Sequence, residues 1–367
     1  MSGKGERILV AMSGGVDSSL AAAILAESGA HVAGVYMKNW AHEPTFADQC
    51  PWQKDIEDAR AVAEKIGIEF RVVNFMREYK ERVVEYLLKG YEEGVTPNPD
   101  VICNREIKFG ALLNYALEHG FDSIATGHYA RRCVRPDGSF DLLQGKDPNK
   151  DQSYFLSMLR QEQVARAHFP VGDMLKSEVR ARAQSLGLPT SEKKDSQGIC
   201  FIGKVRMDDF LSSFLPNQPG NIVDAQGHIL GEHRGLHFYT LGQRRGIRVA
   251  SNTPHQAYVV VEKRQAAREL VVALENPDSK KLYSAHCTLS SLSWIGQPIR
   301  EKAFILARPR YRATAIPVAF ERISETRARL CFATPQRALT PGQICALYDG
   351  EALLGGGIFD EIFYAMP

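Results

Sequence analysis

Two patterns of apolar and polar residues divide the chain near residue 215. Up to about residue 130, short apolar runs alternate with segments in which apolar residues recur every three or four positions, which predicts strands alternating with helices. The predicted strands are 8–12, 31–37, 70–75 and 123–126, and the predicted helices are 20–26, 55–66, 77–89 and 107–118. This alternation indicates a mostly parallel, doubly wound α/β sheet, whose ligands bind beyond the carboxyl ends of its strands.

The second pattern begins after two more predicted helices, at 175–188 and 207–214, and a boundary at Pro219-Gly220. Short β-type runs separated by turns then dominate, and they predict all-β structure. We expect an α/β domain over 1–215, a small mixed or β domain over 216–280, and a C-terminal β-barrel over 281–367.

Composition narrows the class of protein without identifying it. With 44% hydrophobic and 24% charged residues, the chain is typical of globular proteins. No apolar run is long enough to span a membrane, and the polar start resembles no signal peptide. The 7 cysteines include no CxxC pair, which argues against a disulfide scaffold or a zinc ribbon. We expect a cytoplasmic protein without a membrane partner.

The net charge of +2 is unevenly distributed. Residues 221–320 carry 14 Lys and Arg against 7 Asp and Glu, whereas all other residues carry 31 against 36. A basic segment in a nearly neutral chain indicates a polyanionic partner. Chance clustering of solvated charges is the alternative.

The strongest candidate for chemistry is the segment Ser-Gly-Gly-Val-Asp-Ser-Ser at 13–19, between the first predicted strand and helix. Glycines let backbone N–H groups converge on an anion, and a helix N-terminus favours phosphate. No Gly-Lys-Ser/Thr follows, so the loop is not a Walker A loop. An ordinary strand–turn–helix corner is the alternative. Met37, Gly127 and His128 lie at the carboxyl ends of other predicted strands, so the topology brings them to the same edge.

Two cysteines lie in polar, loop-like sequence instead of apolar runs. Cys103 follows Pro99 and directly precedes the helix expected from Ile107, and Cys200 lies in a loop near two lysines. A helix start and nearby cations both favour the thiolate, which is the nucleophilic form. Taken singly, each cysteine is also consistent with a structural role.

The glycine loop resembles the SGGxDS pyrophosphate loop of ATP pyrophosphatases, which adenylate a substrate. Over nearly its whole length, the chain resembles the tRNA-specific 2-thiouridylases. The matching segments are 12–19, 37–40, 96–104, 125–129, 149–155, 195–203, 240–244, 310–312, 340–343 and 354–358. The resemblance implies an α/β domain of the N-type ATP pyrophosphatase kind, similar to adenine-nucleotide hydrolases, over 1–215.

This resemblance also implies sulfur transfer to C2 of the wobble uridine in certain tRNAs. ATP would adenylate the uracil O2, with Mg²⁺ helping to neutralise the phosphates. Cys200 would carry a persulfide, loaded by a sulfur-donor protein or a cysteine desulfurase relay. Cys103 would be the second catalytic thiol, and a Cys103–Cys200 disulfide would form in each turnover. The residues implied to bind ATP are Ala11, Met12, Ser13, Gly14, Gly15, Val16, Asp17, Ser18, Met37 and Gly127.

The target base must leave the anticodon stack to react. By the same resemblance, Asn98, Pro99 and Asp100 contact this base. The residues implied to contact the tRNA anticodon stem-loop elsewhere are His128, Lys150, Asp151, Gln152, Arg310, Tyr311 and Gln343. Without the resemblance, His128 is equally a strand-end histidine, and Arg310-Tyr311 equally an exposed part of a barrel strand.

Two other functions fit part of the sequence. An ATP pyrophosphatase that amidates a small molecule needs the glycine loop but neither the two cysteines nor the basic segment. A tRNA-binding protein that uses ATP only structurally would release no pyrophosphate.

Overall fold

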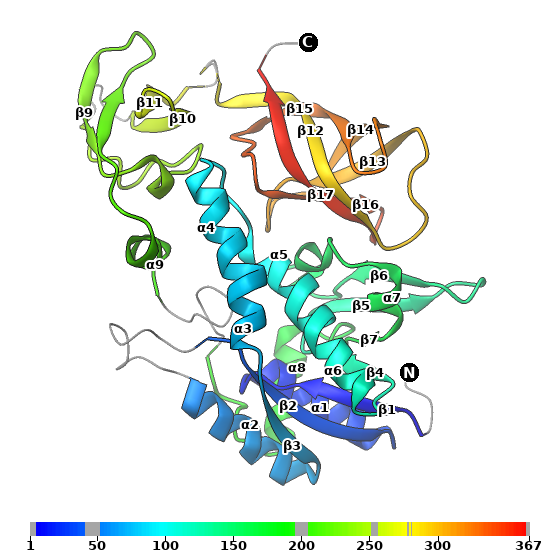
Figure 1. The fold of residues 1–367 in the computed structure, drawn as a ribbon. Coiled ribbons are helices and arrows are strands. Elements are labelled where there is room, and N and C mark those ends of the chain that lie inside the picture. Colours follow the sequence, from blue (N-terminus) through cyan, green and yellow to red (C-terminus); the bar gives the residue numbers. More distant parts are fainter. Residues whose placement is uncertain are drawn as a thin grey trace.

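The computed structural model describes residues 5–40, 52–194, 205–250, 256–276, 279 and 281–364. Figure 1 shows three bodies, with a parallel sheet at the bottom, a small sheet at the upper left and a barrel at the upper right. The predicted fold class is therefore confirmed, while the domain bounds at 215 and 280 stay a prediction. None of the described helices combines the length and apolarity that a bilayer span requires.

The parallel sheet holds the candidate glycine loop. Its strands are β1 (Arg7–Ala11), β2 (His31–Lys38), β3 (Glu69–Asn74), β4 (Ser123–Ala125) and β7 (Ala167–His168). They are hydrogen-bonded in the order β3-β2-β1-β4-β7, and all neighbours are parallel. The chain crosses over between β1 and β4, and doubly wound sheets bind ligands at such a switch point.

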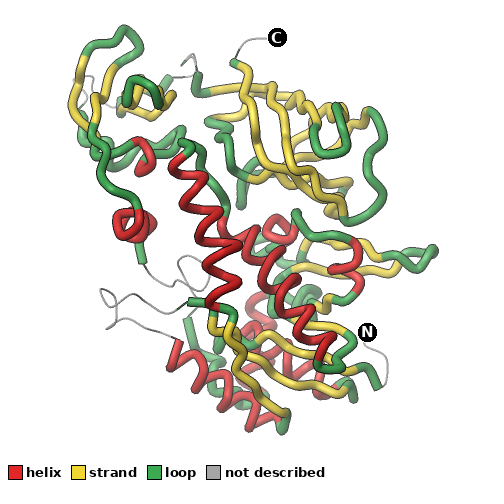
Figure 2. The backbone as a smooth tube through the Cα atoms, viewed as in Figure 1, coloured by secondary structure: helices red, strands yellow, loops and turns green. Residues whose placement is uncertain are grey.

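Side-chain alternation along β1 gives the sheet a separate core on each face. Ile8 and Val10 pack on the side of α1 (Val16–Glu27), α2 (Trp52–Ile66) and α8 (Lys176–Ser185). Leu9 packs on the opposite side. The helical segments on that side are α3 (Met76–Tyr79), η2 (Lys80–Val84), α4 (Glu85–Glu92), α5 (Pro99–Cys103), η3 (Asn104–Ala111) and α6 (Leu112–Glu118). Figure 2 shows them in red, and α4 leads from the parallel sheet toward the small sheet.

The helix expected over 107–118 is present, but the helical segment begins earlier than predicted, at Pro99. Asn98 caps α5, since its side-chain oxygen accepts the N–H of Val101 at 3.2 Å, and Pro99 occupies the first helical turn. Cys103 is therefore the last residue of α5 instead of a loop residue before a helix. The π-helix η3 follows it directly, and π-helical turns often occur at functional sites.

The small sheet is mixed and follows α9 (Met207–Phe214). Its strands β8 (Gly220–Val223), β9 (Ile229–His233), β10 (Tyr258–Arg264) and β11 (Glu269–Leu274) pair in the order β10-β11-β8-β9, with η5 (Leu236–Phe238) after β9. The ammonium group of Lys263 donates to the carbonyl of Gly94 at 3.2 Å, which joins this sheet to the end of α4. Burial of Lys263 lowers its pKa to about 8.

The C-terminal strands form a closed antiparallel barrel. They are β12 (Tyr283–Trp294), β13 (Lys302–Arg308), β14 (Ile316–Arg322), β15 (Ala328–Arg337), β16 (Ile344–Asp349) and β17 (Ala352–Phe363), and β12–β17 pairing closes the ring. Inward side chains such as Leu289, Phe320 and Phe359 fill the interior. The sequence patterns predict this barrel correctly.

The barrel sheet extends into the first domain through a hairpin that the sequence analysis does not predict. Strand β17 pairs with β6 (Phe140–Gln144), which pairs with β5 (Ala130–Val134). The short segments η4 (Ser153–Leu156) and α7 (Gln161–Ala165) follow this hairpin. One sheet therefore crosses the junction between the first domain and the barrel.

A buried ion pair joins the same two bodies. Arg308 of β13 donates to Asp151 at 2.7 Å, and their side chains are only 12% and 5% exposed. Asp151 also accepts the backbone N–H groups of Gly145 and Ser153 and the hydroxyl of Ser153, at 3.0–3.1 Å. This residue, implied to contact tRNA, is thus fully engaged at the junction.

We predict that Arg308→Ala lowers the free energy of unfolding by about 3 kcal/mol, because it leaves the buried Asp151 carboxylate without its counter-charge. Arg329→Ala is the control, since Arg329 pairs with Glu321 on the surface and its loss is expected to cost at most about 1 kcal/mol. Urea titrations of both variants measure the difference. Equal losses would show that the junction does not depend on this ion pair.

Candidate active site

The glycine loop after β1 is held by its own serines. The Ser13 N–H donates to the Ser18 hydroxyl at 3.1 Å, and the hydroxyls of Ser18 and Ser19 donate to the Gly15 carbonyl at 3.1 and 2.8 Å. Gly14 has a φ of +73°, and a Cβ there would lie 2.5 Å from the Asp55 carbonyl oxygen. Both backbone conformation and close packing therefore require glycine at position 14.

The loop presents the start of α1 at the switch point of the sheet. Gly15 is the N-cap of α1, and no side chain caps that end of the helix in the structure. The N–H groups of the first turn thus have the arrangement that binds phosphate. Gly127, after β4, packs on this turn, since a Cβ at Gly127 would lie 2.6 Å from the Ser18 nitrogen. The predicted ATP residues of β1 and β4 are therefore brought together.

The other predicted ATP residues are mostly buried. Met12 and Met37 are 2% and 6% exposed, and the Met12 N–H donates to the Val35 carbonyl at 2.8 Å. Ala11 and Val16 are buried as well. These positions shape the end of the sheet from its core, so contact with a nucleotide would come mainly from their backbone or from small side-chain shifts.

Asp17 is engaged within the protein. Its carboxylate accepts the Tyr129 hydroxyl at 2.7 Å and the Lys176 ammonium at 2.7 and 2.8 Å. Sequence reasoning does not find Lys176, because no local pattern connects the start of α8 with the loop. Asp55 beside Gly14 is likewise paired, with Lys193 at 2.7 Å.

These ion pairs bear on Mg²⁺ binding. Mg²⁺ is usually held by one or two carboxylates together with substrate phosphates, yet Asp17 and Asp55 are both neutralised by lysines. The described residues contain no cluster of three or more His, Cys, Asp or Glu with a metal-binding arrangement. The side chains around the loop therefore do not fit a dedicated Mg²⁺ site.

The residues implied to contact the target base line a cavity of about 400 Å³. Its lining comprises Tyr91, Thr96, Pro97, Asn98, Pro99, Asp100, Val205, Met207 and Gln343. Gln343 of the barrel donates to the carbonyls of Thr96 and Pro97 at 2.8 and 3.3 Å, and the Thr96 N–H donates to Pro341 at 2.9 Å. The cavity is thus shared by the first domain, the barrel and the segment after residue 204.

Arg310 and Tyr311 lie next to this cavity. Tyr311 packs on Phe155 with ring centroids 4.3 Å apart, and on Tyr154 at 6.0 Å. Tyr154 interacts in turn with the side chain of Asn98. Arg310 donates to the Ala338 carbonyl, and burial together with nearby Arg337 lowers the pKa of its guanidinium. The structure therefore brings Asn98, Arg310, Tyr311 and Gln343 into one region.

The remaining predicted tRNA contacts lie near the β5–β6 hairpin. His128 is 8% exposed, packs against both Phe109 and Phe169, and its ring nitrogen lies 2.8 Å from the Thr126 hydroxyl. Burial, and secondarily Lys108, hold the pKa of His128 well below its ordinary value, so it is neutral near pH 7. Gln152 accepts the Tyr129 N–H at 3.0 Å, and Lys150 is half-buried.

The two candidate catalytic cysteines differ in what the structure records. The Cys103 side chain is completely buried, in the core that includes Val101, Ile102 and Ile107. Cys200 and its loop lie outside the described residues, so the approach of the two thiols stays a prediction. Cys345 is a buried barrel residue, and burial raises the pKa of its thiol.

Known proteins match nearly the whole chain. The tRNA methyl transferase HUP domain family matches residues 6–204, its PRC-barrel domain matches 208–274, and the aminomethyltransferase beta-barrel domain matches 284–359. A tRNA-specific 2-thiouridylase MnmA of Akkermansia muciniphila is 55% identical, over 97% of this chain and 99% of the relative. The chain belongs to the tRNA-specific 2-thiouridylase family.

Other thiouridylases of this family agree with that assignment. The protein of the same name from Haemophilus influenzae is 47% identical over 97% of this chain and 93% of the relative. The protein of that name from Shewanella baltica is 44% identical over 98% of this chain and 97% of the relative. Because these relatives align over nearly their full lengths, the whole three-body architecture belongs to the thiouridylase family.

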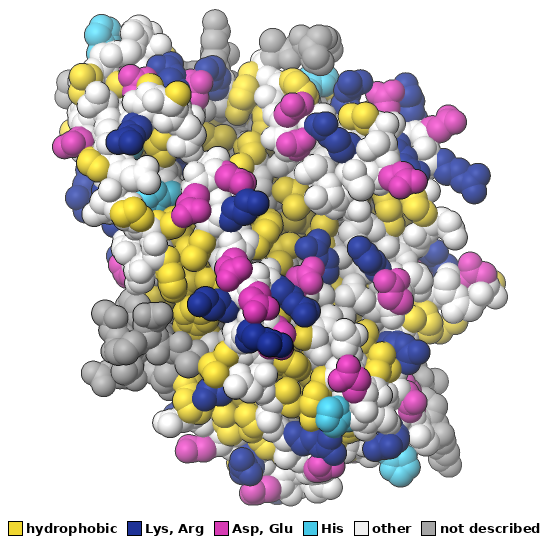
Figure 3. Space-filling view, viewed as in Figure 1, with side chains coloured by type: hydrophobic (Ala, Val, Ile, Leu, Met, Phe, Trp, Pro, Cys, Tyr) yellow, Lys and Arg dark blue, Asp and Glu magenta, His cyan; other side chains and the backbone are white. Residues whose placement is uncertain are grey.

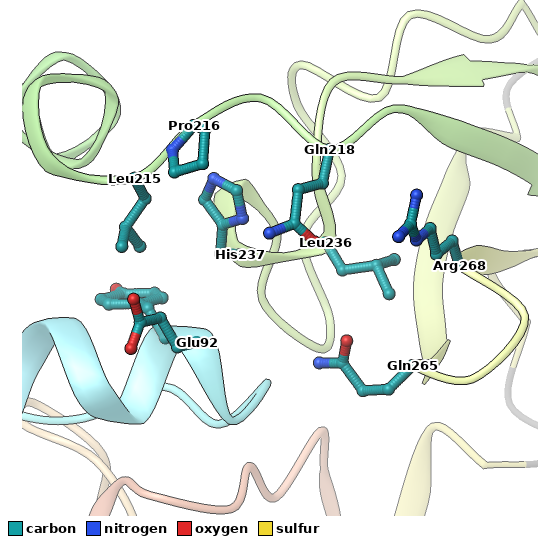
Figure 4. Close-up of a pocket in the computed structure, with 9 residues that line it drawn as sticks. Glu92, Leu215, Pro216, Gln218, Leu236, His237, Gln265 and Arg268 are labelled. Atoms are coloured by element: carbon teal, nitrogen blue, oxygen red, sulfur yellow. The ribbon is translucent and has the colours of Figure 1, made fainter.

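One further cavity of this family member carries none of the predicted site residues. It measures about 270 Å³ and lies between the end of α4 and the small sheet (Figure 4). Glu92, Gln218 and Gln265 line it, together with His237, whose buried Nε2 has no hydrogen-bond partner in the described structure. Burial lowers the pKa of His237. Sequence patterns give no signal for it, because His237 lies in an apolar run.

We predict that Gly14→Ala destabilises this thiouridylase-family fold by about 3 kcal/mol, combining left-handed backbone strain with the clash against Asp55. Gly138→Ala is the matched control, because Gly138 has a φ of +83° but no atom lies within 4 Å of the point that its Cβ would occupy. The control is expected to lose only about 1 kcal/mol. Denaturant titration compares the two, and equal losses would show that the close approach at Gly14 is unimportant.

Proposed function

We propose that the chain is an ATP-dependent tRNA thiouridylase that places sulfur on C2 of the wobble uridine. Family membership supports thiolation of tRNA uridine with ATP as co-substrate. The observation that carries the proposal is the 400 Å³ cavity, where the implied base-contacting residues Asn98–Asp100, the barrel residue Gln343 and the segment leaving the Cys200 region meet.

The first step activates the uracil oxygen. We assign ATP to the glycine loop, with Ala11–Ser18, Met37 and Gly127 around it. The uracil O2 attacks the α-phosphorus, the bond to the β-phosphate oxygen breaks, and pyrophosphate leaves. The uncapped N-terminus of α1 supports the negative charge of the phosphates. A carbonyl oxygen is thereby converted into an adenylate, which is a good leaving group.

The second step transfers sulfur. Cys200 carries a persulfide from an external sulfur donor, and its terminal sulfur attacks C2 so that AMP leaves. The Cys103 thiolate then attacks the Cys200 sulfur, and the electrons of the broken S–S bond form the thiocarbonyl. This leaves a Cys103–Cys200 disulfide that an external thiol reductant must reduce. In a second route, Cys103 first releases the terminal sulfur as sulfide, which attacks C2.

The burial of Cys103 bears on this mechanism, because bulk solvent does not reach its thiol in the structure. We propose that α5 and η3 shift when the target base enters the adjoining cavity, because Cys103 ends the helix that Asn98 caps.

In this mechanism the chain consists of a catalytic domain over 1–215, a central domain over 216–280 and a tRNA-contacting barrel over 281–367.

The proposed tRNA contacts fall into two groups. Lys150, Gln152, Arg310, Tyr311 and Gln343 are partly exposed and are reachable by RNA in the described state. His128 and Asp151 are buried, so RNA contact there would require their neighbours to move. The anticodon stem-loop would lie across the first domain and the barrel, with its target base in the cavity.

The two alternative functions differ from thiolation in the products that they form. An amidating pyrophosphatase turns over without RNA, and an RNA-binding protein with structural ATP forms no pyrophosphate. Family membership and the cavity shared with the barrel favour thiolation over both. Pyrophosphate assays with and without tRNA, together with mass analysis of the tRNA nucleosides, separate all three.

We predict that Cys200→Ser abolishes 2-thiouridine formation because it removes the sulfur carrier, while the Kd for tRNA stays within about twofold of that of the wild type, since every other proposed contact is retained. Cys133→Ser is the control, because Cys133 is a free, exposed cysteine. Nucleoside mass analysis after incubation with ATP and a sulfide or persulfide donor measures the product. Wild-type activity in Cys200→Ser would refute its carrier role.

A further inference from the structure

Five arginines lie on segments that meet at the seam between the small sheet and the barrel, and one carboxylate, Glu275, pairs with two of them. Three belong to the loop 240–248, of which residues 240–244 resemble a thiouridylase segment and which has no role in the proposed chemistry. They are Arg244, Arg245 and Arg248, and the barrel contributes Arg310 and Arg337. On the face drawn in Figure 3, basic and acidic side chains are interspersed.

Ion pairs and hydrogen bonds fix this loop against the barrel. Arg337 pairs with Glu275 at 2.7 Å and donates to the Gly242 carbonyl at 3.0 Å. Arg244 reaches the same Glu275 at 3.1 Å. A Cβ at Gly242 would lie 2.6 Å from the Ala338 side chain, and Ala338 is the residue whose carbonyl accepts from Arg310. The loop and the Arg310 segment are therefore neighbours.

The charges of this cluster are poorly balanced. Glu275 is the only carboxylate that pairs with any of the five arginines in the described structure, and it serves two of them. Arg245 and Arg248 are exposed and make no side-chain ion pair or hydrogen bond there. Nearby Arg337 disfavours the charged form of Arg310, as does burial, and both lower the pKa of Arg310. A bound polyanion would relieve this repulsion.

The cluster is continuous with the base cavity. The Thr240 hydroxyl, at the start of the loop, lies 3.4 Å from that of Thr96, which lines the cavity. Arg310 provides a second connection, because both Arg310 and Asn98 interact with Tyr154, and Asn98 lines the cavity. A nucleotide in the cavity would therefore have its neighbouring phosphates close to these arginines.

We propose that this arginine cluster binds the phosphodiester backbone of the RNA strand that flanks the base in the cavity, with Arg245 and Arg248 as the outermost phosphate contacts. The inference rests on the proposed function. It assigns the small sheet a direct part in RNA binding, whereas the contacts implied by resemblance lie in the first domain and the barrel. An acidic protein is the competing partner, and the nearby base cavity favours RNA.

The test is the double variant Arg245→Ala/Arg248→Ala in the full chain. The matched control is Lys302→Ala/Arg329→Ala, which also removes two surface cations around one carboxylate, Glu321. Lys302 begins β13, whereas Arg310 follows its other end, about 20 Å away for a strand of this length. Fluorescence anisotropy with an anticodon stem-loop RNA measures Kd at several salt concentrations.

We predict that the test variant weakens binding by at least about tenfold at about 0.15 M salt, and that the slope of log K against log salt becomes shallower by about 1.5. The KM for tRNA is expected to rise in parallel, while the control resembles the wild type. A Kd and slope equal to those of the control would overturn the proposal. So would unchanged RNA binding with thiolation lost only when a donor protein supplies the sulfur, because that points to an acidic protein partner.

These outcomes are separable from failure of the proposed function. Wild-type protein that binds the RNA but forms no 2-thiouridine would contradict thiolation while the salt dependence still tests the arginines. Wild-type protein that does not bind the RNA would overturn the proposed phosphate site directly.

Discussion

The junction between the α/β domain and the barrel is the constraint on which the candidate site depends. The Arg308–Asp151 pair and the β6–β17 pairing hold the barrel against the first domain. Only in that position does Gln343 reach the carbonyls beside Asn98. The cavity proposed for the target base has walls from both bodies, so neither would form it alone. Asp151, predicted as an RNA contact, thus has a second role in building the pocket.

The two proposed steps take place in different kinds of site, with ATP at the closely packed glycine loop and sulfur transfer at the cavity. The loop is rigid, because Gly14 is enclosed by Asp55 and Gly127 is pressed on the first turn of α1. It is suited to holding phosphates in one geometry. The cavity lies at a boundary between bodies, and Cys103 is covered beside it. Nucleotide binding would then need little rearrangement, whereas sulfur transfer would need more.

Local sequence patterns predict most elements of this fold but few of its long-range contacts. The apolar runs of β1 and β2 and the glycine loop are strong signals because neighbouring residues determine them. The start of α5 is missed because the apolar periodicity begins only near Ile107, whereas Asn98 accepts the Val101 N–H and begins a helix. The partners Lys176 of Asp17 and Arg308 of Asp151 are 159 and 157 residues away, beyond any local pattern.

The continuous sheet across the junction makes the first domain depend on the C-terminal end of the chain. Strand β6 is paired on one side by β5 and on the other by β17, from the far end of the sequence. Without the C-terminal strands, β6 would expose an open sheet edge, which invites association with other chains. Removal or exchange of the C-terminal barrel strands would therefore yield a fragment prone to association instead of a smaller working enzyme. The ends of this polypeptide must evolve together.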